Sequence, residues 1–144
     1  MSKLEEMIER HEGYRAFPYH CTSGKLTIGI GRNIEERGVS RDEAEYMLRN
    51  DIEASTKELT AQFPWFSSLG PVRQAAMIDL HFNMGMAALL KFKSMLGLME
   101  EGFYGAASRQ LLVGSGPGGK SRYYSQVGVR AETISKMIHT GEWQ

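Results

Sequence analysis

Residues 11–31 read HEGYRAFPYHCTSGKLTIGIG and carry the strongest signals for the fold. Residues 14–19 and 26–30 are rich in aromatic and β-branched side chains, which favour strands. Thr22-Ser23-Gly24 between them is typical of a turn. Glycines alternate with isoleucines over 28–31, which indicates that another backbone or a ligand approaches closely there. The stretch predicts a small antiparallel β element rather than a parallel sheet.

Helices are predicted on both sides of this element. A capping box at residues 2–5 starts a helix over 3–11, which Gly13 ends. A second capping box at 40–43 starts the longest helix, 40–61, and Pro64 stops it. Pro71 begins a helix to about Met84, ended by Gly85. Further helices are predicted near residues 87–90, 92–100, 103–113 and 129–140, with a flexible glycine-rich loop at 114–119.

Length and composition limit the classes of protein. The chain has 144 residues, 42% hydrophobic and 24% charged, which fits one globular domain and excludes a disordered chain, a coiled coil or a collagen-like repeat. The apolar runs are too short to span a membrane, and the charged N-terminus predicts no secretory signal. A single cysteine excludes an intramolecular disulfide framework and a cysteine-cluster zinc site, and favours synthesis in a reducing cytoplasm.

Charge is balanced overall but unevenly spread. Residues 1–60 carry 9 Lys and Arg against 12 Asp and Glu, and residues 61–144 carry 8 against 5. This asymmetry is too mild for a nucleic-acid partner. It suits a modestly anionic polymer lying against the C-terminal half.

Three residues in the opening stretch are candidates for chemistry. Glu12 ends the first helix, where the helix dipole disfavours a carboxylate; it is either a solvated helix-end residue or a functional acid. Cys21 and Thr27 follow nine and fifteen residues later, and on a hairpin both could face the helix end. The plainer interpretations are a buried apolar thiol and a strand-forming residue, and the residues alone favour these.

Other features carry weaker signals. The four histidines, at positions 11, 20, 81 and 139, show no metal-ligand spacing, so no metal site is expected. Residues 116–121, GPGGKS, lack the spacing of a phosphate-binding loop. The nine methionines lie mostly at helical spacing and are interpreted as core residues.

The ordered motifs resemble the phage-type lysozymes, the endolysin family. The resemblance begins with Glu12-Gly13 and residues 27–31, TIGIG, and covers nearly the whole chain in order. The further matching blocks are residues 40–45, 50–51, 72–76, 82–85, 121–124, 130–131 and 140–143. The resemblance implies an α+β, mainly α, lysozyme-like fold in one catalytic domain over 1–144. Its parts would be a small β lobe over about 13–39, a linking helix over about 40–61 and a larger helical lobe over about 62–144 that includes helix 3–11.

The resemblance also implies a catalytic set. The family has a Glu, then an Asp nine positions later, then a Thr six positions further on. These positions read Glu12, Cys21 and Thr27 here, so the middle residue departs from the pattern. Glu12 would act as the general acid, with its pKa set by burial against a neighbouring Arg130. A Cys21 thiolate would act as base on a water that Thr27 positions, or attack the sugar directly.

The other implied site residues are less direct. Asn33, Phe82 and Gln110 would bind substrate in a cleft, although core packing is an equal alternative for Phe82. Arg32 and Asp51 would form a supporting ion pair. The alternative is a solvent-exposed pair that contributes little to stability. Met95 replaces a polar cleft residue, and residues 114–119 look like an insertion.

The implied activity is that of an endolysin muramidase. It would hydrolyse the β-1,4 bond between N-acetylmuramic acid and N-acetylglucosamine in bacterial peptidoglycan, and it would need no metal or cofactor. The protein would be a monomer that binds no nucleic acid and has no stable association with a membrane. It would collect in the host cytoplasm until a separate protein permeabilises the membrane. The alternatives are a lytic transglycosylase, which needs no second carboxylate, an inactive peptidoglycan-binding relative, and a small helical structural domain.

Overall fold

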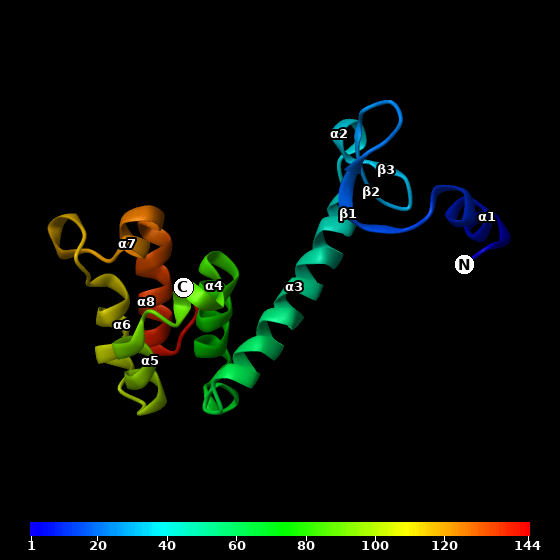
Figure 1. The fold of residues 1–144 in the computed structure, drawn as a ribbon. Coiled ribbons are helices and arrows are strands. Elements are labelled where there is room, and N and C mark those ends of the chain that lie inside the picture. The colour runs from blue at the N-terminus through cyan, green and yellow to red at the C-terminus, as the bar shows by residue number, and fades with distance from the viewer. The chain divides into compact units, whose positions relative to one another are not determined.

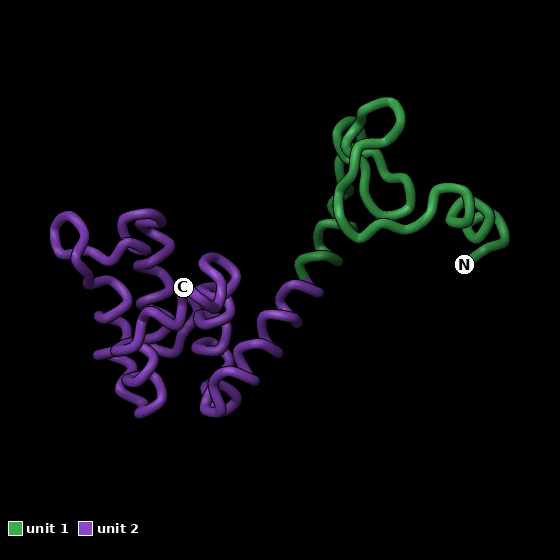
Figure 2. The backbone as a smooth tube through the Cα atoms, in the orientation of Figure 1, with its two compact units in different colours: residues 1–48 green, residues 49–144 purple.

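The computed structural model describes residues 1–144 and falls into two compact units, Met1–Leu48 and Arg49–Gln144 (Figure 2). The fold is α+β and mainly helical, with one three-stranded sheet, which confirms the predicted class (Figure 1). The boundary between the units falls within α3, Arg41–Gln62. None of the helices combines the length and apolar character that crossing a membrane requires.

The first unit begins with α1, Lys3–Glu12, close to the predicted bounds. The capping box is present: the Ser2 hydroxyl accepts from the Glu5 amide at 3.2 Å, and the Glu5 carboxylate accepts from the Ser2 amide. These bonds satisfy backbone donors that the first helical turn leaves free. Gly13 ends α1 with its amide donating to the Glu9 carbonyl at 2.8 Å. The placement of this helix against the helical lobe stays a prediction.

The sheet has the strand order β1-β2-β3 and is antiparallel throughout, as predicted. Its strands are β1 Arg15–His20, β2 Leu26–Gly29 and β3 Arg32–Asn33. Thr27 on the central strand lies opposite Tyr19 on one side and Asn33 on the other. A register irregularity interrupts β1 between Arg15 and Tyr19. Residues on the central strand are therefore held by hydrogen-bonded neighbours at both edges.

A short helix that the sequence reasoning missed follows the sheet: α2, Ile34–Arg37. Asn33 caps it by accepting from the Glu36 amide at 3.0 Å. The Glu35 carboxylate accepts from the Leu26 amide at 3.0 Å, and Lys25 lies 2.8 Å from Glu36. These contacts fasten α2 to the start of β2.

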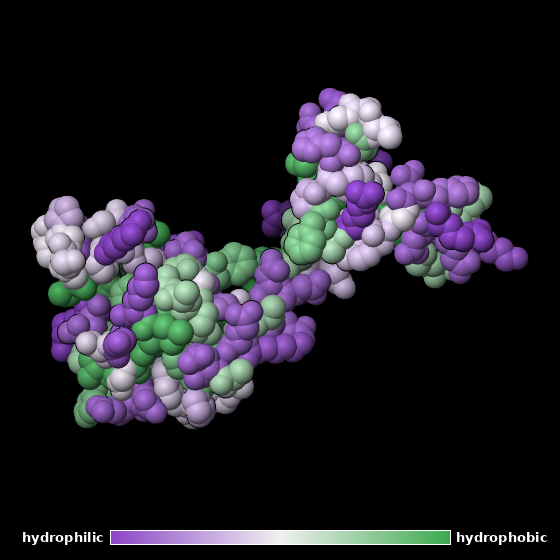
Figure 3. All heavy atoms as spheres, in the orientation of Figure 1, coloured by the Kyte–Doolittle hydropathy of each residue, from purple (hydrophilic) through white to green (hydrophobic).

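The second unit holds the hydrophobic core. It contains the C-terminal part of α3, then α4 Pro71–Leu89, α5 Lys93–Glu100, α6 Tyr104–Leu112, α7 Arg122–Val127 and α8 Val129–Thr140. Short 3₁₀ turns lie at Phe66–Ser68 and Pro117–Gly119. Helix α6 packs against α5 and α8, and α8 also contacts α4 and α7. In Figure 3 hydrophobic residues show between hydrophilic ones on the visible face of this unit.

Most helix predictions in this unit are confirmed. Gly85 has non-helical angles, φ 75° and ψ 164°, so the helical turns of α4 are interrupted where the sequence indicated. Helix α7 was missed, although Ser121 caps it by accepting from the Tyr124 amide at 3.0 Å. Of the methionines, those at 77, 95, 99 and 137 are buried, while those at 1, 7 and 47 are exposed.

The loop at 114–119, predicted to be flexible, is folded back on itself. Val113 and Lys120 pair as an isolated antiparallel bridge. The Gly114 amide donates to the Gly119 carbonyl, and the Gly116 amide to the Lys120 carbonyl, both at 2.9 Å. A Cβ on Gly116 would lie 2.6 Å from the Lys120 carbonyl oxygen, so the turn closes only with glycine there. Its backbone hydrogen bonds are thus made within the turn itself.

Candidate active site

Glu12 lies against the backbone of Gly31. A Cβ built on Gly31 would be 2.8 Å from Glu12 Oε2, 3.0 Å from its Cδ and 3.1 Å from its Cγ. The carboxyl group therefore occupies the space that any other residue at 31 would fill. Glu12 is the last residue of α1, and Gly31 is in the turn between β2 and β3. This contact joins the end of the first helix to the TIGIG motif.

The two glycines of this motif serve different needs. Gly29 and Gly31 have φ angles of 67° and 68°, which other residues adopt at a cost. A Cβ on Gly29 would meet nothing within 4 Å, whereas one on Gly31 would collide with Glu12. The expected close approach is thus made at Gly31, by a side chain of the same chain.

Cys21 follows β1 at the start of a tight turn. Its amide donates to the Lys25 carbonyl at 3.0 Å, and its carbonyl accepts from the Gly24 amide at 2.8 Å. Its Sγ lies 3.0 Å from the Ser23 hydroxyl oxygen, and its side chain is half-buried. The plainer interpretation of a fully buried, inert thiol is wrong, because the sulfur has a polar partner and partial solvent access.

The Cys21 thiol is more acidic than an ordinary thiol. The Ser23 hydroxyl is the main cause, and the Lys25 and Ser23 backbone and the Thr27 hydroxyl add to it; together they lower the pKa of Cys21 from 9.0 to about 7. Hydrogen bonds to a thiolate stabilise it relative to the thiol. The thiolate, the reactive and basic form, is therefore more accessible near neutral pH than for an ordinary cysteine.

Thr27 is the buried residue of the first unit, with only 3% of its surface exposed. Its hydroxyl donates to the Lys25 carbonyl at 3.0 Å. The Cys21 amide donates to the same Lys25 carbonyl at 3.0 Å, so the two residues share one acceptor. The structure therefore brings Cys21 and Thr27 together, and places Glu12 on Gly31, four residues beyond Thr27.

Asn33 and Arg32, two further predicted site residues, have partners within the first unit. The Asn33 side chain is occupied at both ends, because its Nδ2 donates to Glu36 Oε2 at 3.1 Å while its oxygen caps α2. The Arg32 guanidinium binds both carboxylate oxygens of Glu43, with Nη1 at 3.1 Å from Oε2, and donates to the Gly38 carbonyl at 3.2 Å. The Ser40 amide first and Arg32 second lower the pKa of Glu43.

In the second unit, Arg130 binds Asp79. Its Nε and Nη2 lie 3.0 Å from the two carboxylate oxygens, a bidentate pair that fixes the guanidinium plane. Asp79 raises the pKa of Arg130 further. Tyr123 is buried beside them, and burial first and Asp79 second raise its pKa to about 12. The pairing of Arg130 with Glu12, and that of Asp51 with Arg32, would each join the two units and stay predictions.

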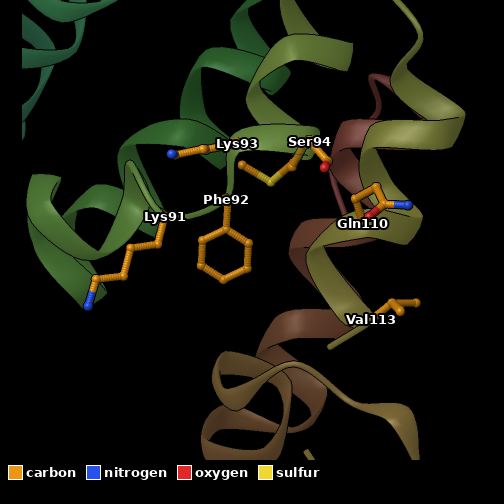
Figure 4. Close-up of a pocket in the computed structure, with 7 residues that line it drawn as sticks. Lys91, Phe92, Lys93, Ser94, Gln110 and Val113 are labelled. Carbon is orange, nitrogen blue, oxygen red and sulfur yellow. The ribbon is translucent and has the colours of Figure 1, made fainter. Parts of the chain in front are cut away.

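Phe82 and Gln110 are both exposed on the second unit. Phe82 on α4 is 49% exposed and lies outside the core, so core packing does not explain it. Gln110 on α6 lines a pocket of about 250 Å³ together with Val113 and the segment 91–95 (Figure 4). Substrate binding by both residues stays a prediction.

Sequence reasoning missed three features of the second unit. Asp79 was not recognised as the partner of Arg130, which lies 51 residues away. His81 is buried with its Nε2 3.0 Å from Glu58 Oε2 and its Nδ1 without a partner. Lys91 and Lys93 beside the Gln110 pocket were not singled out either. Only the pattern Lys-Phe-Lys-Ser at the start of a helix was available as a signal for these lysines.

Comparison with known proteins places the chain in a family. The chain is 24% identical to "Probable T4-type lysozyme 1" of Dictyostelium discoideum, over 98% of the chain and 96% of that protein. It is 32% identical to an endolysin of Acyrthosiphon pisum secondary endosymbiont phage 1, over 74% and 73%. It also matches 28% of the pre-baseplate central spike protein Gp5 of Enterobacteria phage T4, at 26% identity over 96% of the chain. The family model for phage lysozyme matches residues 9–130, and the chain belongs to the phage lysozyme family.

Proposed function

We propose that this chain is a muramidase that hydrolyses the β-1,4 bond between N-acetylmuramic acid and N-acetylglucosamine in bacterial peptidoglycan. The observation that carries the proposal is the arrangement of the first unit: the Glu12 carboxyl group lies on Gly31, and Cys21, in the turn after β1, shares the Lys25 carbonyl with Thr27 on β2. Glycoside hydrolysis needs an acid for the leaving oxygen and a second group at the anomeric carbon. Membership of the phage lysozyme family supports the same substrate.

The proposed reaction is a single displacement. Glu12 donates its proton to the glycosidic oxygen as the bond from that oxygen to C1 of the muramic acid breaks. A water held by the Thr27 hydroxyl attacks C1, and the Cys21 thiolate takes the proton that the water loses. The released sugars then carry one new hydroxyl each, and Glu12 and Cys21 return to their starting protonation states through solvent.

The lowered pKa of Cys21, about 7, supports its role as base. A base whose pKa lies near the working pH is both available in its unprotonated form and strong enough to accept a proton. A carboxylate at this position would be fully ionised but a weaker base. Cys21 therefore suits the position without a second carboxylate.

Two other reactions would cleave the same bond. A direct attack by the Cys21 thiolate on C1 would give a thioglycoside that water then cleaves, with retention of configuration. A lytic transglycosylase would use the muramic acid 6-hydroxyl as the nucleophile, and the Cys in place of an Asp favours this candidate, because such an enzyme needs no second carboxylate.

Digestion of purified peptidoglycan in ¹⁸O-labelled water separates all three. Mass spectrometry should find one ¹⁸O at each new muramic acid end, and NMR of early products should show the α anomer. Release of the β anomer would instead indicate retention of configuration, and therefore the thioglycoside route. An unlabelled 1,6-anhydro end would establish the transglycosylase, and an absence of any cleavage would contradict the proposed function.

We also propose that the chain acts as an endolysin, reaching the wall from the host cytoplasm once another protein has permeabilised the membrane. Expression inside bacteria should then leave cells intact until a permeabilising agent is added. Lysis without any such agent would contradict this localisation.

A further inference from the structure

An irregularity in strand β1 brings two of its side chains together. Arg15 and Tyr19 are four residues apart, which is about 13 Å along a regular strand. Their partners on β2, Gly29 and Thr27, are only two residues apart, so the extra residues of β1 are accommodated by a bulge. The guanidinium carbon of Arg15 lies 4.3 Å from the centroid of the Tyr19 ring. The cation is therefore held against the face of an aromatic ring.

The strand pairing also decides which face of the sheet these two side chains occupy. Residues directly opposite each other in an antiparallel pair project from the same face. Tyr19 lies opposite Thr27, and Arg15 lies opposite Gly29, which shares a face with Thr27 because successive residues of a strand alternate. Arg15 and Tyr19 are therefore on the sheet face that carries the candidate catalytic Thr27.

Arg15 has no anionic partner in the chain. No carboxylate lies within ion-pair distance of it, whereas Arg32 and Arg130 are each bound to both oxygens of a carboxylate. Contact with the Tyr19 ring restricts the guanidinium, and the Arg15 side chain is exposed to solvent. A guanidinium held in this way can bind a carboxylate with two parallel hydrogen bonds.

The same segment exposes an aromatic ring. Phe17, in the middle of the bulge, is 82% exposed, which is more than any other large hydrophobic side chain of the chain. Tyr14, at the start of the segment, is 69% exposed. Neither ring contributes to the core, and aromatic residues and arginine are the residue types that dominate binding surfaces. The segment thus offers a flat apolar ring two residues away from a free cation.

Peptidoglycan combines the two chemistries that this segment can bind. Its sugar rings present flat C–H surfaces that pack on aromatic rings, and its peptide stems carry free carboxylates. A neutral glycan would use the Phe17 ring alone, and a small anion would use Arg15 alone. Because β1 is an edge strand, its outer side is not covered by another strand of the sheet. A long polymer can therefore lie along it.

We infer that Arg15, Phe17 and Tyr19 form a second surface for peptidoglycan, which holds the polymer and takes no part in its cleavage. Arg15 binds a carboxylate of a peptide stem, Phe17 packs on a sugar ring, and Tyr19 holds the Arg15 guanidinium in place. The inference rests on the proposed function, because it names a further contact with the same substrate. Such a contact is equal in the ground state and the transition state, so it lowers KM and leaves kcat unchanged.

The test measures binding and turnover separately. The full-length Glu12→Gln protein is sedimented with purified insoluble peptidoglycan, with and without Arg15→Gln and Phe17→Ser. Each of these two substitutions should weaken binding about threefold, and both together about tenfold. In the active chain the same pair should raise KM on peptidoglycan about tenfold without changing kcat. Once the carboxyl groups of the peptidoglycan have been converted to amides, Arg15→Gln should have no further effect on binding.

The matched control combines Arg37→Gln with Phe103→Ser, because Arg37 is an exposed arginine without an ion pair and Phe103 is 60% exposed. It should leave binding and KM unchanged. The inference is overturned if the Arg15 and Phe17 pair of substitutions leaves binding intact, if the control weakens binding equally, or if kcat falls while KM stays the same.

The two proposals can fail separately. A chain that binds peptidoglycan through this surface but releases no product would refute the proposed function and keep the inference. A chain that cleaves peptidoglycan with the same KM with and without the Arg15 and Phe17 side chains would refute the inference and keep the proposed function.

Discussion

The carboxyl group of Glu12 lies where the side chain of any residue other than glycine at position 31 would be, with its Oε2 2.8 Å from an ideal Cβ on Gly31. The end of α1 thus contacts the turn between β2 and β3 through the Glu12 side chain, which fills the space that glycine leaves at position 31. The Glu12 side chain is exposed, and the absence of a side chain at Gly31 leaves room for its carboxyl group beside the turn, as a general acid at this place would require.

Gly31→Ala should therefore displace Glu12 and reduce activity. The matched control is Gly29→Ala, which has almost the same φ, 67° against 68°, but open space around its Cβ. Both substitutions should lower stability by about 1–2 kcal/mol, because alanine is strained at this φ. Only Gly31→Ala should also lower kcat, by tenfold or more on the scale of misplaced catalytic groups. Equal kcat values in the two folded variants would show that the contact has no catalytic consequence.

Glu12→Gln should remove the general acid and keep its shape. Activity on peptidoglycan should fall by roughly a hundredfold or more. Stability should stay the same or rise slightly, because a carboxylate at the last residue of α1 faces the negative end of the helix dipole. Glu9→Gln, one turn earlier on α1, serves as the control and should keep normal activity. Near-normal turnover by Glu12→Gln would rule out the proposed acid.

Thr27→Val should show what the hydroxyl of Thr27 contributes, apart from the role of the residue in forming the strand. The variant keeps the branched shape but removes one of the two donors to the Lys25 carbonyl, which keeps the Cys21 amide, so the loss of stability should be about 0.5–1.5 kcal/mol. Turnover should fall far more than this loss of stability explains, when measured well below the unfolding temperature. Thr27→Ser restores the hydroxyl and should recover most of the rate. A stable Thr27→Val variant with full activity would reduce Thr27 to a strand former.

The parts of the fold that the sequence predicts are those with local causes. Helix α1 starts at its capping box, and α4 is interrupted at Gly85, because each signal lies within one turn of its effect. Helix α2 was missed because four residues are too few to show a periodicity, and its stability comes from contacts with Lys25 and Leu26. Helix α7 was hidden by the glycine-rich turn before it, although Ser121 and Gly128 mark its ends.

The candidate site also combines features that the local sequence indicates with features that depend on the folded structure. The glycine pattern indicated a close approach near position 31, but not that the Glu12 side chain makes it. The lowered pKa of Cys21 depends on Ser23, two residues away, and on a turn geometry that spacing alone does not define. The Asp79–Arg130 pair joins residues that only the packing of α4 and α8 brings together.

The acidity of Cys21 should be visible in its chemistry. Iodoacetamide reacts with the thiolate, so the alkylation rate should rise with pH and reach half its plateau at about pH 7, the pKa of Cys21. Ser23→Ala removes the largest cause of the lowered pKa, so the midpoint should move up toward 9.0 and alkylation at pH 7 should slow. Thr22→Ala, an exposed neighbour in the same turn, should leave the midpoint unchanged. Because Cys21 is the only cysteine, the reaction reports on this residue alone.

The same titration should govern activity. If the Cys21 thiolate is the base, kcat/KM should fall as the pH drops below about 7, since protonation removes the base. Ser23→Ala should shift this acid limb upward together with the alkylation midpoint. Cys21→Ser should lose most activity, because a hydroxyl hardly ionises near neutral pH, while Cys21→Asp should stay active with its acid limb moved toward about pH 4. A fully active Cys21→Ser enzyme, with an unchanged acid limb, would remove Cys21 from the mechanism and favour the transglycosylase, whose nucleophile is the sugar itself.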